Sequence, residues 1–193
     1  MDKLKFGFDI DGCIANIIPL LCSTVIKECS VKFTPRNISR YSIEEILDIP
    51  RSKVIGIINE VIANVDEVKP YPGAITFIQK YYEYSQEPIV LVSNRWDYYS
   101  TQVWLNKWLS VPWIIKYTDC KKGQIVKDLG IDVFVEDRIE NAEDIAKAGA
   151  TVLLISRMWN KFYRIKDEGI IRVKGWKGIT EFFEKERSNV NMF

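Results

Sequence analysis

The stretch Lys5–Gly12, KFGFDIDG, decides the fold of this 193-residue chain. Its first half is a short run of aromatic and small apolar residues, which is typical of a strand buried on both faces of a sheet. The run ends in two acids, Asp9 and Asp11, and Gly12 then permits a tight turn. Because open parallel sheets bind ligands at the carboxyl ends of their strands, the sequence predicts a site directly after this strand.

Brief runs rich in β-branched and aromatic residues recur along the chain, and segments with helical periodicity separate them. This alternation predicts an α/β fold with a Rossmann-like, three-layer parallel sheet core. The predicted strands are 5–9, 89–93, 113–116, 132–136, 151–155 and 169–173. The predicted helices are 74–84, 99–109, 122–129, 141–148 and 179–187. Gly130 and Gly149 follow two of these helices and are expected to end them.

One interval, 14–70, is too long to be a loop between the first strand and the next helix. Within it, apolar side chains recur at helical spacing from Val54 to Val65, and a second apolar face extends from Ile17 to Ile26. We therefore expect residues 14–70 to form a small helical insertion over the carboxyl end of the sheet. Residues 1–13 and 71–193 are expected to form the core domain.

The composition is that of a globular protein, with 47% apolar and 27% charged residues. The formal net charge of +1 indicates no basic surface of the kind that attracts nucleic-acid polymers or anionic membranes. No apolar run reaches the roughly 20 residues needed to cross a bilayer, and the first residues show no signal-peptide pattern. These features predict a cytoplasmic protein with a small-molecule partner, and they leave the oligomeric state open.

The chain contains no histidine, and its four cysteines form no CxxC pair. The lack of histidine excludes Ser-His-Asp catalysis, Cys-His catalysis and phosphohistidine intermediates, and together with the cysteine spacing it argues against a zinc site. Catalysis must therefore use carboxylates, lysine, hydroxyls or a metal ion. The cysteines are expected to be free, buried thiols in a reducing compartment: Cys13, Cys22, Cys29 and Cys120.

A second hydrophobic strand, VFVED, ends in the adjacent acids Glu136 and Asp137. The carboxyl ends of parallel strands share one edge of the sheet, so Asp9, Asp11 and Asp137 can converge on one hard cation with oxygen ligands. Carboxylates this close repel each other unless a cation or a shared proton lies between them. The alternatives are a solvated turn after the first strand and two unrelated acidic helix caps.

Two further elements fit a phosphate site. Ser93 closes a predicted strand and is followed by Asn94 and Arg95, which together offer a hydroxyl, backbone N–H groups and a nearby helix N-terminus. Lys121 and Lys122 begin the helix that leads to the second acid pair, and one of them could neutralise both a carboxylate and a phosphoryl group. A simple helix cap at Ser93 and a solvated lysine pair are the alternatives.

The order of these four elements resembles the haloacid dehalogenase superfamily: a strand ending DxDG, a strand ending in serine or threonine, a lysine, and a strand ending in paired acids. The resemblance implies a phosphatase with Asp9 as the nucleophile and Asp11 as the acid that protonates the leaving group and then activates water. It also implies Ser93 and Lys122 as the phosphate-binding and charge-neutralising residues. Mg²⁺ would be held by Asp9, the backbone carbonyl of Asp11, and Asp137.

The same resemblance addresses three details. Lys122 is preferred to Lys121 because it stands eight residues before Gly130, the usual offset in relatives whose helix ends in a Leu-Gly pair. Glu136 departs from the commoner Asp-Asp pair, which leaves its role open between outer-shell ligand and charge balance. Residues 14–70 resemble the helical cap called type C1, with the return from cap to core at PYPGA.

Within the superfamily, the segments TQVWLNKWL, EDR and RMWNK resemble those of the cytosolic 5'(3')-deoxyribonucleotidases. The expected activity is therefore magnesium-dependent hydrolysis of nucleoside monophosphates through an aspartyl phosphate. The alternatives are a sugar-phosphate phosphatase, a phosphomutase-like transferase, and a catalytically silent binding module of the same fold. Aromatic side chains near the predicted turns and cap could stack on a nucleobase: Tyr41, Trp96, Tyr98, Tyr99 and Trp159.

Overall fold

A computed structural model describes residues 3–41, 43–119 and 121–190, and it confirms the predicted α/β fold. One six-stranded sheet has the order β3-β2-β1-β4-β5-β6, and every adjacent pair of strands is parallel. The strands are β1 (Phe6–Phe8), β2 (Ile89–Ser93), β3 (Trp113–Tyr117), β4 (Val133–Glu136), β5 (Thr151–Ile155) and β6 (Ile170–Val173).

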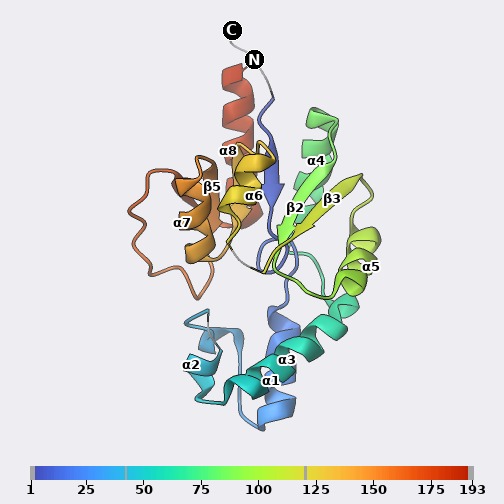
Figure 1. The fold of residues 1–193 in the computed structure, drawn as a ribbon, viewed down its shortest axis with the longest axis vertical. Helices are drawn as coiled ribbons and strands as arrows, with labels where there is room; N and C mark the ends of the chain where they lie inside the picture. Colours follow the sequence, from blue (N-terminus) through green and yellow to red (C-terminus); the bar gives the residue numbers. More distant parts are fainter. Residues whose placement is uncertain (1–2, 42, 120, 191–193) are drawn as a thin grey trace.

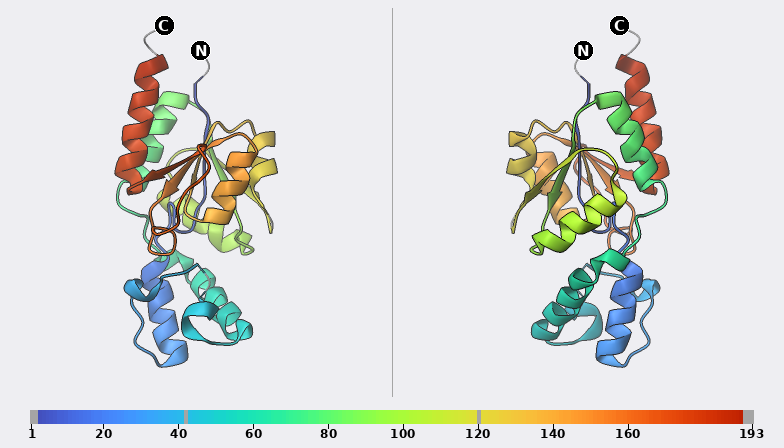
Figure 2. Two further views of the ribbon diagram at one scale, coloured as in Figure 1. Left: turned by 90° about the vertical axis from the view of Figure 1, so that its left-hand side faces the viewer. Right: turned by 90° about the vertical axis from the view of Figure 1, so that its right-hand side faces the viewer.

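Helices cover both faces of the sheet (Figures 1 and 2). One face carries α4 (Ala74–Ser85), α5 (Tyr98–Trp108) and α8 (Gly175–Val190). The other face carries α6 (Gly123–Asp128) and α7 (Ile139–Lys147). Two buried clusters of apolar side chains fill the layers, which gives the three-layer architecture. No helix in the described part of the chain is both long enough and apolar enough to cross a membrane.

The strand β1 lies inside the sheet between β2 and β4, and its alternating side chains explain why. Phe6 and Phe8 point to one face, where they join an aromatic cluster with α4 and α8. Gly7 points to the other face, where an added Cβ would lie only 2.7 Å from Ile131 Cδ1 and 2.8 Å from Phe134 Cδ2. Close packing on both faces fixes the position of Asp9, the residue that follows the strand.

The segment between β1 and α4 forms helices of its own, beyond the carboxyl ends of the strands and away from the two chain termini (Figures 1 and 2). They are α1 (Ile18–Cys29), η1 (Pro35–Asn37), α2 (Glu44–Leu47), α3 (Arg51–Ala63) and η2 (Val65–Glu67). The chain enters and leaves this segment at neighbouring points, since Ala15 and Pro70 form an antiparallel bridge and Tyr71 N donates to Ile14 O at 2.8 Å.

The two apolar faces predicted in this segment pack on each other. Leu21 of α1 and Val54 and Val61 of α3 belong to one buried cluster, separate from the clusters of the sheet. The helix α3 ends at Ala63, so Val65, the last residue of the predicted stripe, lies in η2 and packs into the sheet-side cluster instead.

Three cysteines can be compared with the prediction. Cys13 and Cys22 are free and buried, whereas Cys29 is free and half-buried. Cys120 lies outside the described residues.

Candidate active site

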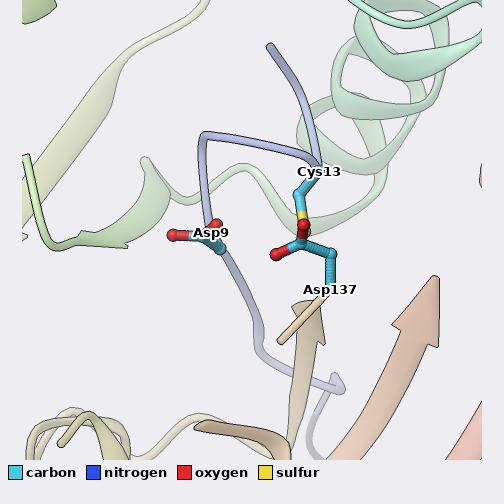
Figure 3. Close-up of side chains that lie close together, drawn as sticks. All are labelled: Asp9, Cys13 and Asp137. Atoms are coloured by element: carbon cyan, nitrogen blue, oxygen red, sulfur yellow. The ribbon is translucent and has the colours of Figure 1, made fainter. Parts of the chain in front are cut away.

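Acids predicted from two strand ends lie together at the carboxyl edge of the sheet. Asp9 follows β1 and Asp137 follows β4, and these strands are parallel neighbours in which Phe8 pairs with Val135. The donor atoms of Asp9, Asp137 and the nearby Cys13 all lie within 4.8 Å of one another (Figure 3). All three residues are buried, so the edge holds a compact acidic cluster shielded from water.

Lys122, at the N-terminus of α6, is a buried cation of this cluster. Its ammonium donates to Asp9 Oδ1 at 2.5 Å and to Glu136 Oε2 at 3.0 Å. Its side chain is 1% exposed, whereas that of Lys121 is 83% exposed. Burial lowers the pKa of Lys122, but Asp9 and Glu136 outweigh burial and the net shift is upward. The structure therefore places Lys122 rather than Lys121 beside the first acid, where the neighbouring carboxylates favour the charged ammonium.

Glu136, whose role the sequence left open, lies beside Asp137 and shares the Lys122 ammonium with Asp9. One carboxylate oxygen accepts the hydrogen bond from Lys122, and the other accepts the backbone N–H groups of Asp137 and Arg138, each at 3.1 Å. Asn141 also donates to this carboxylate at 3.3 Å. The side chain thus orients the lysine and the turn that follows β4.

Asp11 forms a two-point ion pair with Arg95. Its carboxylate accepts hydrogen bonds from Arg95 Nε at 2.8 Å and from Nη2 at 2.6 Å. The arginine is nine-tenths buried, and its guanidinium lies 5.6 Å from the centroid of the Trp104 ring. The sequence predicted that Arg95 binds substrate, yet two of its nitrogens are occupied by Asp11. This bidentate geometry fixes the direction of the Asp11 carboxylate.

Ser93 and Asn94 line the same cavity as the acids. Ser93 ends β2 and is buried, and its hydroxyl oxygen accepts the backbone N–H of Arg95 at 3.2 Å. Asn94 donates from its amide to Thr118 O at 2.9 Å. The serine therefore shapes the turn after its strand and lines the cavity, but it is not a helix cap, because the N-cap of α5 is Asp97, whose side chain accepts from Ser100 N at 3.0 Å.

The loop after β5 supports the site, and sequence reasoning gave its residues no such role. Asn160 donates to Asp137 O at 2.7 Å and to Ile155 O at 2.8 Å, and Trp159 Nε1 donates to Asp137 O at 3.1 Å. Arg157 Nε donates to Gly12 O at 2.7 Å. The resemblance of the RMWNK segment was the one feature of the sequence that pointed to this loop. The residue types alone do not show which distant carbonyl groups the loop contacts.

Gly12 is required by this close packing. Its backbone has φ +74°, and an added Cβ would lie 1.9 Å from Asp137 Oδ2. Any other residue would displace the carboxylate of the second acid pair.

A cavity of about 320 Å³ joins the acidic cluster to the helices of segment 14–70. Its size is within the range of small-molecule sites. This cavity is lined by three of the aromatic residues that were expected to stack on a nucleobase: Tyr41, Trp96 and Trp159. The other two, Tyr98 and Tyr99, are exposed outside it, and Tyr98 packs on Tyr117 with ring centroids 4.2 Å apart.

Solved structures share the fold of this chain. A haloacid dehalogenase-like family hydrolase of Streptococcus pneumoniae superposes with a TM-score of 0.62 at 13% identity, over 93% of this chain and 98% of that one. A structure from Lactobacillus delbrueckii, described provisionally as a phosphoglycolate phosphatase, gives a TM-score of 0.71 at 13% identity, over 95% and 99% of the two chains. The chain has the haloacid dehalogenase-like fold.

The predicted resemblance to that superfamily is thus confirmed for the fold. Among curated proteins, a nucleotidase of Clostridium acetobutylicum is 26% identical over 197 residues, which cover 97% of this chain and 100% of that protein. No protein-family model matches the chain.

The magnesium ion that the haloacid dehalogenase-like fold implies fits the charges of the site. Within the described part of the chain, Arg95 pairs with Asp11 and Lys122 pairs with Asp9 and Glu136, whereas Asp137 has no cation within salt-bridge distance. When its acids are ionised, the cluster therefore carries more negative than positive charge, which a divalent cation would balance.

The donor atoms also favour a hard ion. Burial raises the pKa of the Cys13 thiol well above its usual value, and the acids Asp137 and Asp9 raise it further, so the sulfur is a weak ligand. The carboxylates of Asp9 and Asp137 are the oxygen donors that Mg²⁺ prefers. The backbone carbonyl of Asp11 stays a predicted third ligand.

The buried acids predict how stability depends on pH in the absence of metal. Burial is the main cause that raises the pKa of Asp9 from 3.8 to about 7 in the folded protein, and the pKa of Asp137 also rises. Between pH 3.8 and about pH 7, Asp9 therefore binds more protons in the folded state than in the unfolded state. The free energy of unfolding falls as pH rises through this range. We expect the melting temperature in EDTA to fall from pH 5 to pH 8. Added Mg²⁺ should raise it more at pH 8 than at pH 5.

The chain suits this measurement because it has no histidine to titrate in the same range. Asp9→Asn should make the profile shallower, with the remaining slope due to Asp137, whereas Asp66→Asn, a substitution of an exposed residue, should leave it unchanged. A metal-free protein that became more stable from pH 5 to pH 8 would contradict the assignment of raised pKa values to these acids.

Proposed function

We propose that this protein is a magnesium-dependent phosphomonoester hydrolase that forms an aspartyl phosphate on Asp9 and acts on nucleoside monophosphates. One observation carries the proposal: the Asp9 carboxylate is held by the buried ammonium of Lys122 at 2.5 Å, beside Asp137 and at the base of the cavity. The distant likeness to a nucleotidase supports the same class of reaction.

Asp9 is the proposed nucleophile. Its free carboxylate oxygen attacks the phosphorus atom, and the bond from phosphorus to the leaving oxygen breaks. Lys122 holds the attacking carboxylate in one orientation and counters the negative charge of the phosphoryl group, at a site where burial strengthens such attraction. Mg²⁺ bound by Asp9 and Asp137, when present, would neutralise the charge that builds up on the phosphoryl oxygens.

Asp11 is the proposed acid and base. In its protonated form it gives a proton to the leaving oxygen in the first step, and the resulting carboxylate takes a proton from the attacking water in the second, which restores the protonated form. Arg95 positions Asp11 through its bidentate pair, and it stays a proposed substrate-binding residue because it lines the cavity and its Nη1 has no hydrogen-bond partner among the described residues. Ser93 and Asn94 stay in place as the proposed phosphate ligands at the cavity wall.

We assign residues 14–70 the role of a cap over the core formed by 1–13 and 71–193. The helices of this segment stand over the carboxyl edge of the sheet and supply much of the cavity wall (Figure 1). A covered site excludes bulk water, which protects the aspartyl phosphate until the intended water attacks. The nucleoside would lie between this cap and the aromatic side chains Trp96 and Trp159.

The nucleophile can be tested by Asp9→Asn. An amide attacks phosphorus poorly, so we expect magnesium-dependent release of phosphate from p-nitrophenyl phosphate to fall by at least roughly 10²-fold. Asp66→Asn is the matched control and should retain wild-type activity. Circular dichroism should show both variants folded. Activity of Asp9→Asn above about a hundredth of wild type would rule out the assignment.

The nucleotide can be tested by comparing dUMP, dTMP, dGMP and AMP with ribose 5-phosphate and glucose 6-phosphate at fixed Mg²⁺. Stacking is worth about 1–3 kcal/mol per base. For the preferred nucleotides, kcat/KM should therefore exceed that for ribose 5-phosphate by roughly 5- to 150-fold. Trp96→Ala should reduce this ratio of kcat/KM values. Tyr99→Ala should leave the ratio unchanged, because Tyr99 lies outside the cavity. Equal turnover of the sugar phosphates would end the nucleotidase assignment while leaving the phosphatase assignment intact.

A further inference from the structure

The cavity has two chemically different ends. The end at the sheet is charged and includes Asp9, Asp11 and Lys122. The end at segment 14–70 is formed by what we call the aliphatic wall, whose main residues are Ile17, Leu21, Val54, Ile58, Val61 and Val65. Because both ends line one continuous cavity, a molecule whose phosphate lies at the charged end can extend its organic part along this wall.

The aliphatic wall offers almost no hydrogen-bonding groups. Among the described residues of 14–70 that line the cavity, all are aliphatic except Tyr41 and Glu44. Much of the wall belongs to α1 and α3, whose backbone N–H and C=O groups are largely used within the helices. The Tyr41 ring is itself engaged, since the Arg138 guanidinium lies 4.4 Å from its centroid. Such a surface cannot replace the water that a hydroxyl group gives up on binding.

We infer that the aliphatic wall selects substrates by the apolar surface next to the phosphate. The inference rests on the proposed hydrolase function and names its substrate class: phosphomonoesters whose organic part presents apolar surface and few hydroxyl groups, such as alkyl and aryl esters and deoxynucleotides. Sugar phosphates are rejected because their hydroxyls would be buried unpaired, and the loss of such hydrogen bonds disfavours binding.

Contact with the wall would act on the specificity constant. The free energy gained by burying apolar surface scales with the area buried. Each methylene group that contacts the wall should therefore strengthen binding by a similar factor. The organic group is remote from the reacting phosphorus atom. Its binding therefore serves mainly to hold the phosphate in line with Asp9.

A series of primary alkyl phosphates from methyl to hexyl tests the inference cleanly, because the leaving groups share the same chemistry and differ only in apolar surface. With wild-type protein and Mg²⁺, kcat/KM should rise by about fourfold per methylene until the wall is covered. Glucose 6-phosphate should fall well below hexyl phosphate, although it is of similar size. A flat series would overturn the inference.

Two substitutions on α3 form a matched pair. Ile58 is half-buried on the wall, whereas Ile55 is 48% exposed outside the cavity. Ile58→Gln should reduce the increase in kcat/KM per methylene, and Ile55→Gln should reproduce the wild-type series. A similar slope in both variants would contradict the role of the wall. If Ile58→Gln does not fold, the wild-type series still decides the question.

Failure of the proposed function would look different. A protein that releases no phosphate from any ester would refute the hydrolase assignment. The same alkyl phosphates would then be measured as ligands by calorimetry, where the wall predicts that Kd falls with each added methylene. A Kd independent of chain length would overturn the inference as well. Hydrolysis of p-nitrophenyl phosphate and dTMP together with a flat alkyl series would refute the inference alone.

Discussion

The buried ammonium of Lys122, shared between Asp9 and Glu136, is the interaction on which the rest of the structure depends. A buried lysine is tolerated only when anions pair with it, and here the pairing requires three elements to meet: the end of β1, the end of β4 and the start of α6. The parallel pairing of β1 with β4 supplies the two acids. The cavity is then built around a carboxylate whose direction is fixed before any substrate arrives.

Much of the core follows from the sequence because strands buried on both faces must be continuous apolar runs. The bounds of β2 and β5 match the predicted 89–93 and 151–155, and Gly130 and Gly149 follow α6 and α7 with positive φ, as expected of residues that end a helix. The gathering of Asp9 and Asp137 could also be predicted, since parallel strands end at one edge. Lys122 could be distinguished from Lys121 only by its offset from Gly130, and burial now gives the physical reason.

Other features depend on contacts between distant segments, which no local pattern encodes. The two-point pair of Arg95 with Asp11 is one example, because it depends on how the turns after β1 and β2 face each other. The hydrogen bonds of Asn160 to the Asp137 carbonyl, and the approach of Cys13 to the acids, likewise arise only when the loops are in place. The types of these residues alone are compatible with many other surroundings.

The central claim is that Asp9 carries the phosphoryl group during turnover, and trapping the covalent protein tests it most directly. Wild-type protein would be mixed with substrate and Mg²⁺, quenched in acid within one turnover and reduced with borohydride, which converts an acyl phosphate of aspartate to homoserine. Mass spectrometry of the peptide that contains Asp9 should then show homoserine at this position, dependent on substrate. Turnover with aspartate unchanged at position 9, or homoserine at another aspartate, would contradict the account.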